Sequence, residues 1–331
     1  MSAPETPALP LEWPNHAAAW REWRAALAGT RMHHGWILAG KSGLGKRAFS
    51  AAAARELVAS EGAPSPDAHP DIITLTHGPR NDKEARAAAE GKPYERARSI
   101  RVDQVRTMQK RLTTRPTLGE RRAIVIDPAD DLEVSAANAL LKSLEEPPAG
   151  TFFLLVTHSP SRLLPTIRSR CRMLRFPVLR DQELAAMLDA AEITATPEAR
   201  RAAVEAADGS LGAAIRFAEQ ELAPMGGLIR NILSAGDRDL SQRADLARMI
   251  GPRPDRERLQ AVLDLAQRIV ADAARSTASH AHRAQLADLY GELGTLAAKA
   301  PTYNFDTGLL TLEIGGLLAR AAPASEPAHG R

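Results

Sequence analysis

Cysteine is almost absent from this chain of 331 residues, whose single thiol is Cys171. One thiol can build neither a disulfide framework nor a cysteine-rich zinc site within the chain, so we expect no metal site. This cysteine usage fits a reducing compartment. No apolar run approaches the roughly 20 residues that cross a bilayer, and residues 1–14 do not resemble a signal peptide. The sequence therefore predicts a cytoplasmic protein without a membrane partner.

Aromatic residues are also scarce, at 4% of the chain, although 44% of the residues are hydrophobic. The cores must therefore be built mainly from aliphatic side chains. The net charge of +3 is only mildly basic, which permits contact with nucleic acid without establishing it. The length predicts two or three domains.

Short apolar runs alternate with helical patterns through the first half of the chain. The predicted strands are 35–39, 71–75, 123–126 and 152–156, and the predicted helices are 16–27, 48–58, 103–112 and 135–144. Strands that alternate with helices indicate an α/β fold with a parallel sheet between two helical layers. Residues 77–98 are polar and lack an apolar period, so they are predicted to form an exposed insertion without regular structure.

Beyond Pro177 only helical periodicity is found. The predicted helices are 182–191, 197–207, 211–222, 256–274, 281–296 and 307–318. We expect an α/β domain over 1–178, a small helical domain over 179–225 and a second helical domain over 226–331. The tail from Ala322 is predicted to be disordered.

Residues 40–47 follow the pattern of a phosphate-binding loop, with Gly40, Gly43, Gly45 and Lys46 between a predicted strand and a predicted helix. In a complete motif, backbone N–H groups wrap the phosphate and a final Ser or Thr hydroxyl holds Mg²⁺. Arg47 stands at that final position, and a guanidinium has no acceptor for a metal. The loop is therefore predicted to be degenerate. It is either a phosphate cradle without a competent Mg·ATP site or a turn that only joins strand and helix.

A strand that ends at an acid follows later in the chain. Residues 122–127 (RAIVID) have the form of a Walker B strand, with Asp127 at its end. An active ATPase of this class needs a second acid beside that Asp to orient water, but Pro128 occupies the place. Asp130 and Asp131 are expected to lie on the far side of the proline turn. The sequence therefore predicts a Walker-B-like strand without a catalytic acid.

Three later stretches carry a specific resemblance. Residues 136–148 (AANALLKSLEEPP), 163–172 (LLPTIRSRCR) and 208–214 (DGSLGAA) resemble, in this order, motifs of the AAA+ clamp-loader subunits of bacterial DNA polymerase III. The similarity runs from about residue 31 to 217 and is nearest to the delta-prime class. It implies an AAA+ P-loop domain, a helical lid and an all-α collar domain.

The resemblance also implies roles for single residues. Arg170 corresponds to an arginine finger that reaches the γ-phosphate of ATP held by a neighbouring subunit, and Arg168 is expected to support it. Such a finger stabilises charge on the transferring phosphoryl group. Thr157 corresponds to the sensor-1 position, and Gly212 stands where ATP-hydrolysing relatives carry an Arg. The alternative is that Arg168, Arg170 and Arg172 form a solvated basic stretch at a strand edge.

The implied function is that of a non-catalytic clamp-loader subunit that requires no cofactor of its own, with ATP and Mg²⁺ held in neighbouring subunits. The expected partners are the tau/gamma and delta clamp-loader subunits, the sliding clamp within the complex, and the backbone of primer–template DNA in nonspecific contact. One alternative is an active ATP-hydrolysing motor subunit of the tau/gamma type, which requires Ser or Thr at position 47, Glu at 128 and zinc cysteines. Another is a free-standing AAA+ protein that binds nucleic acid, which requires a recognition helix or a marked basic patch.

Overall fold

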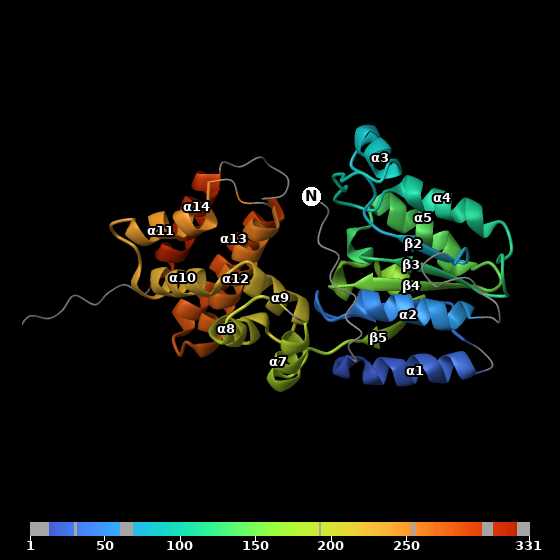
Figure 1. The fold of residues 1–331 in the computed structure, drawn as a ribbon, viewed down its shortest axis with the longest axis horizontal. Helices are drawn as coiled ribbons and strands as arrows, with labels where there is room; N and C mark the ends of the chain where they lie inside the picture. The colour runs from blue at the N-terminus through green and yellow to red at the C-terminus, as the bar shows by residue number, and fades with distance from the viewer. Residues whose placement is uncertain are drawn as a thin grey trace, which may run out of the picture. The chain divides into compact units, whose positions relative to one another are not determined.

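The computed structural model describes residues 13–29, 32–59, 69–191, 193–252, 254, 256–299 and 307–322 (Figure 1). The chain divides into two compact units, one of residues 1–187 with 209–212 and one of residues 188–208 with 213–331. Over the described ranges, no helix is both long and apolar enough to cross a membrane. The predicted division into domains at residues 178 and 225 stays a prediction. The predicted tail lies, from residue 323 on, outside the described residues.

The described part of the first unit is built on a parallel sheet of five strands in the order β2-β3-β4-β1-β5. The strands are β1 Gly35–Ala39, β2 Ile72–Leu75, β3 Arg122–Ile126, β4 Thr151–Thr157 and β5 Arg172–Arg175. The pairs β1–β4, β1–β5, β2–β3 and β3–β4 all run parallel. The predicted α/β class is confirmed.

Helices cover both faces of this sheet, as Figure 1 shows. They are α1 Ala17–Ala28 and α2 Lys46–Val58 on one face, and α4 Val102–Leu112 and α5 Val134–Glu145 on the other. Successive side chains of a strand point to opposite faces, and β1 follows this rule. Trp36 and Leu38 join the core under α1 and α2, whereas Ile37 and Ala39 join the core under α4 and α5. Burial on both faces explains why β1, β3 and β4 read as nearly continuous apolar runs.

Strand β5 was not predicted. It pairs with β1 at the edge of the sheet, and Leu174 is its one fully buried side chain. Arg172 and Arg175 are exposed at its two ends. A four-residue edge strand with one buried residue has too short an apolar pattern to be recognised in a sequence.

The insertion at residues 77–98 has more structure than its composition predicted. It contains α3 Asp82–Ala89, whose first turn is capped by Asn81, since the Asn81 side chain accepts a hydrogen bond from Glu84 N at 3.0 Å. Pro79 and Arg96 form an antiparallel bridge. Arg101 donates to the carbonyl oxygens of Pro79 and Arg80 at 2.6 and 2.8 Å. The expectation of no regular structure was wrong because caps and polar contacts, rather than an apolar face, order this segment.

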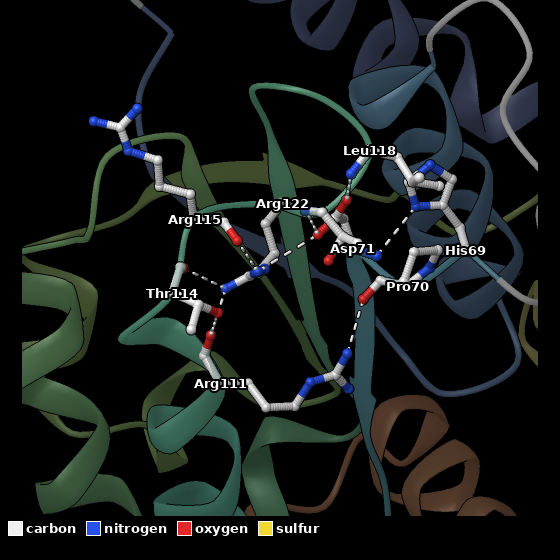
Figure 2. A network of polar contacts seen from close by, with 9 residues as sticks. His69, Pro70, Asp71, Arg111, Thr114, Arg115, Leu118 and Arg122 are labelled. Atoms are coloured by element: carbon white, nitrogen blue, oxygen red, sulfur yellow. Dashed lines mark hydrogen bonds and ion pairs between the residues drawn. The ribbon is translucent and has the colours of Figure 1, made fainter.

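A buried ion pair closes the sheet at the amino ends of β2 and β3 (Figure 2). Asp71 and the guanidinium of Arg122 are almost completely buried, and Arg122 Nη2 lies 3.5 Å from Asp71 Oδ1. Arg122 also donates to the carbonyl oxygen of Arg111, in the last turn of α4, and to those of Thr114 and Arg115 in the segment that follows α4. The Asp71 carboxylate accepts hydrogen bonds from backbone N–H groups of the same segment, at residues 117 and 118. The pair thus anchors the connection from α4 to β3.

In the described part of the chain beyond β5, the regular secondary structure is entirely helical. They are α7 Asp181–Ala190, α8 Pro197–Ala207, α9 Leu211–Glu219, α10 Ala223–Ala235, α11 Ser241–Ile250, α12 Arg256–Ser276, α13 His280–Lys299 and α14 Thr307–Arg320. The predicted helical character is confirmed, but α10 and α11 were not predicted. α10 includes Gly226 and Gly227, which lie at the start of the expected second helical domain. Buried Met225, Ile229 and Ile232 hold this helix in place despite its glycines.

Candidate functional site

The phosphate-type loop connects β1 to α2, so the predicted order of strand, glycine turn and helix is confirmed. Gly43 and Gly45 have φ values of 77° and 73°, in the left-handed region that glycine adopts without strain. Lys46, the first residue of α2, is only 3% exposed. Its ammonium group donates to the carbonyl oxygens of Gly40 and Lys41, at 2.7 and 2.5 Å. The loop lysine is therefore bonded to the loop itself.

Burial also changes the charge properties of this lysine. Removal from water lowers the pKa of Lys46 to about 8, and the carboxylates of Asp127 and Asp130 partly oppose the change. The amine therefore lies within electrostatic range of two acids, both in the segment that follows β3.

Aromatic side chains lie against the loop. A Cβ atom at residue 45 would lie 2.4 Å from the ring of Trp13, so the indole is in direct contact with Gly45. Trp13 stacks on His16 with ring centroids 5.1 Å apart. Burial lowers the pKa of His16 to about 4, so the imidazole is neutral near pH 7, and its Nε2 lies 2.7 Å from Leu44 O. Sequence reasoning missed these contacts because Trp13 and His16 precede the motif by about 30 residues.

The segment at residues 210–212 meets the same loop. Ser210 Oγ donates to Ser42 O at 2.8 Å, and Gly212 N donates to Gly43 O at 3.1 Å. Gly212 was singled out because it lacks the arginine of ATP-hydrolysing relatives. In this structure its backbone N–H binds the loop. The absence of a side chain at Gly43 lets the two segments approach closely, since a Cβ atom there would lie 2.9 Å from Gly212 Cα. Arg216, one turn further on, is exposed.

Arg47 faces the carboxylate at the end of β3. Its Nε lies 3.8 Å from Asp127 Oδ2, and its side chain is 72% exposed, whereas that of Asp127 is 11% exposed. Burial raises the pKa of Asp127, and the positive charges of Arg47 and Lys46 partly oppose this change. Arg47 thus places a positive charge beside this largely buried carboxylate.

Asp130 lies close to this site, contrary to the expectation that it would lie on the far side of the proline turn. Its carboxylate accepts hydrogen bonds from Thr157 Oγ1 and His158 N, both at 2.5 Å, and from Ser159 N at 3.2 Å. The short helical turn Ala129–Asp131 brings the side chain back to the end of β4. Thr157, the sensor-1-like residue, is therefore bonded to a carboxylate of its own chain.

Arg170 lies at the other end of β1. A Cβ atom at Gly35, the first residue of β1, would lie 3.1 Å from Arg170 O, whereas the phosphate-type loop begins after Ala39, the last residue of β1. Four steps of about 3.3 Å separate Gly35 from Ala39, or roughly 13 Å. The structure therefore does not bring Arg170 together with the loop of its own chain.

The three arginines of the basic stretch have different surroundings. Arg168, at the end of α6 Pro165–Arg168, is exposed. Arg170 Nη2 lies 2.8 Å from Glu145 Oε1, and the side chain is 35% exposed. Arg172 Nε lies 2.9 Å from Glu22 Oε1, and its guanidinium covers the ring of Trp36. Two of the three arginines are thus ion-paired within the chain.

Neither a metal nor a reactive thiol is indicated by the described residues. They contain no group of three or more His, Cys, Asp and Glu residues that could hold a metal ion. Burial raises the pKa of the Cys171 thiol to about 12, so the thiol stays protonated near pH 7.

Comparison with known proteins adds to this geometry. A family model described as DNA polymerase III, delta subunit matches residues 15–180, half of the chain. The DNA polymerase III subunit delta' of Pseudomonas aeruginosa is 36% identical over 173 residues, 48% of this chain and 47% of that relative. The subunit tau of Salmonella typhimurium is 29% identical over 241 residues, 70% of this chain and 34% of that relative. A gamma-subunit-related protein of Thermotoga maritima has a crystal structure that aligns with a TM-score of 0.44 and 16% identity, covering 91% of this chain and 98% of that one. The chain thus spans less than half the length of each of the two sequence relatives.

Proposed function

This chain belongs to the family described as DNA polymerase III, delta subunit, and we propose that it is a non-catalytic clamp-loader subunit of that polymerase's holoenzyme. In this role it assembles with tau/gamma and delta subunits and supplies Arg170 in trans to a neighbouring ATPase subunit. The neighbour holds the ATP and Mg²⁺. Hydrolysis there is coupled to loading of the sliding clamp on primer–template DNA, whose backbone the complex contacts without sequence specificity.

The position of Arg170 is the observation that carries this proposal. Arg170 lies beside the first residue of β1, and the phosphate-type loop follows the last residue of β1. A phosphate group on this loop is therefore out of reach for the guanidinium. A phosphate that Arg170 binds has to be presented by another chain, which is the geometry of a finger that acts in trans.

The condition of the loop supports the non-catalytic part of the proposal. Arg47 replaces the hydroxyl that would hold Mg²⁺ and faces Asp127 instead, and Pro128 stands in place of a second acid. Lys46 is bonded to two carbonyl oxygens of the loop. Trp13 lies against Gly45. Each of these features removes a group or a space that a productive Mg·ATP complex uses.

The experiment is a reconstituted complex with tau/gamma and delta subunits, sliding clamp, ATP and primer–template DNA. Arg170→Ala should leave assembly intact and slow both DNA-stimulated ATP hydrolysis and clamp loading by at least about tenfold, because arginine fingers contribute roughly 10³–10⁵ in rate in GTPases. Arg175→Ala, which removes an exposed arginine of the same segment, is the matched control. Normal clamp loading by the Arg170→Ala complex would refute the finger assignment.

The likeness to a tau subunit over 70% of the chain favours an ATP-hydrolysing motor subunit as the alternative. The two functions predict different behaviour of the chain alone. A motor subunit hydrolyses ATP in a reaction that Lys46→Ala abolishes. The proposed non-catalytic subunit shows no hydrolysis that depends on Lys46, whether alone or in a complex whose other subunits are inactivated.

A further inference from the structure

The proposed finger is held by an acid from another helix. Glu145 is the last residue of α5, and its Oε1 lies 2.8 Å from Arg170 Nη2. The two residues are 25 positions apart, and Arg170 follows α6. The Glu145 side chain is 49% exposed and that of Arg170 is 35% exposed, so water and a partner chain can reach both.

The rest of the guanidinium is bound by neutral groups of its own turn. Arg170 Nη1 donates to Thr166 O at 3.0 Å and to Ser169 Oγ at 3.3 Å. A carbonyl and a hydroxyl can stay in place when an anion approaches, because neither carries a net charge. These two contacts therefore keep the guanidinium oriented whether or not Glu145 is bound.

Glu145 differs from these neutral groups because its charge has the same sign as a phosphate. A carboxylate within hydrogen-bond distance of the finger repels an incoming triphosphate and neutralises the charge that the finger would apply. An exposed ion pair contributes little net free energy, so the carboxylate can turn into water at low cost. The helix end itself stays fixed, since His34 Nε2 lies 2.9 Å from Leu144 O and Gln109 donates to Ser143 Oγ at 3.1 Å.

We propose that Glu145 is a latch on the arginine finger. It occupies the anion site of Arg170 in the separate subunit, and the terminal phosphate of a nucleoside triphosphate bound by the neighbouring subunit displaces it. The inference rests on the proposed function, because it requires a phosphate from another chain. Its consequence is that the finger engages only where a triphosphate competes successfully with the carboxylate, which discourages contact with a neighbour whose site is empty.

The test uses the full chain in the reconstituted complex and measures the rate of DNA-stimulated ATP hydrolysis against ATP concentration. Glu145→Gln keeps the shape and a hydrogen-bond acceptor but removes the charge. It should lower the ATP concentration at half-maximal rate by about two- to fivefold, the range of an exposed ion pair, without lowering the maximal rate. The difference from wild type should shrink at high salt, because salt screens the carboxylate in the wild-type chain.

Glu146→Gln is the matched control, because this neighbouring exposed acid undergoes the same change of charge. It should leave both parameters at their wild-type values. The latch is refuted if Glu145→Gln behaves like Glu146→Gln, raises the half-maximal ATP concentration, or lowers the maximal rate, which would make Glu145 a residue that positions the finger.

Arg170→Ala separates this inference from the proposed function. If Arg170→Ala slows hydrolysis and Glu145→Gln has no effect, only the latch fails. If Arg170→Ala has no effect, the finger assignment fails whatever Glu145→Gln does. If both proposals hold, the double variant Glu145→Gln/Arg170→Ala is as slow as Arg170→Ala alone.

Discussion

Arg47 Nε lies 3.8 Å from Asp127 Oδ2, so the last residue of the phosphate-type loop motif faces the carboxylate at the end of β3. Arg47 thereby places a positive charge beside a largely buried acid. Burial is the main cause that raises the pKa of Asp127. Among the positive charges that lower this pKa, that of Arg47 has the largest effect.

Arg47→Ala should raise the pKa of Asp127 further. An acid whose pKa is higher in the folded than in the unfolded chain stabilises the fold at low pH and loses that contribution as the pH rises through its folded pKa. The variant should therefore lose more stability near pH 7 than near pH 4. The loss should stay below about 1 kcal/mol, because Arg47 is mostly exposed. Urea unfolding at both pH values measures it, with the exposed Arg21→Ala as the control. An equal loss at both pH values would show that the pair is not coupled.

Lys46 predicts a pH dependence of the opposite kind. Its pKa is about 8 in the folded chain, against an ordinary value of 10.5, mainly because the amine is buried. The folded chain therefore releases this proton more readily than the unfolded chain. Between about pH 8 and 10.5, wild-type stability should rise relative to that of Lys46→Met, by up to roughly 3 kcal/mol. Urea unfolding of both proteins across this range checks the prediction, which a constant difference would contradict.

The buried pair of Arg122 and Asp71 should be costly to break from one side. Arg122→Ala leaves a buried carboxylate without its cation, at a cost of about 3–5 kcal/mol in the free energy of unfolding. The double variant Asp71→Asn/Arg122→Met removes both charges and should be less destabilised than the sum of its own two single variants, Asp71→Asn and Arg122→Met. Arg111→Ala is the control. The Arg111 guanidinium is exposed and donates a hydrogen bond to Pro70 O at the edge of the network (Figure 2). Additive losses in urea unfolding would argue against coupling.

The pH dependence of Asp71 follows from its partners. Burial alone would raise its pKa, but the N–H groups of Leu118 and Thr117 and the charge of Arg122 lower it below the ordinary value. Stability from this carboxylate is present above the unfolded pKa and is lost as the pH falls through the folded pKa. In Arg122→Ala that loss should begin at a higher pH than in the wild type, which acid unfolding monitored by circular dichroism can detect.

Asp130 should stabilise the turn after β4. Asp130→Ala leaves Thr157 Oγ1 and the N–H groups of His158 and Ser159 without this acceptor, at a cost of about 1–3 kcal/mol. Hydrogen exchange at the amides of residues 158 and 159 should accelerate. Asp131→Ala, which removes contacts to His77 and Arg162 only, should leave those two amides protected. Equal exchange rates in the two variants would disprove the role of Asp130.

Local sequence patterns were sufficient to predict much of the secondary structure of the first unit. The strands at 35–39, 123–126 and 152–156 were predictable because both faces of the sheet are covered, which requires a continuous apolar run. The loop at residues 40–46 was recognisable because glycines and a lysine at fixed spacing are needed for its shape. Strand β5 was not, since its edge position leaves Arg172 and Arg175 exposed.

The sequence by itself determined the class of the fold, the strand–loop–helix order of the phosphate-type loop and the family, because all three depend on residue types at short fixed spacings. Only the tertiary structure decided the partners of the functional side chains. Asp130 meets Thr157, and Glu145 meets Arg170, across separations of about 25 residues. These contacts form because the packing of strands and helices brings together residues that are far apart in the sequence. Short-range sequence patterns carry no information about them. For the same reason, only the folded chain shows that Arg170 and its own phosphate-type loop lie at opposite ends of one strand.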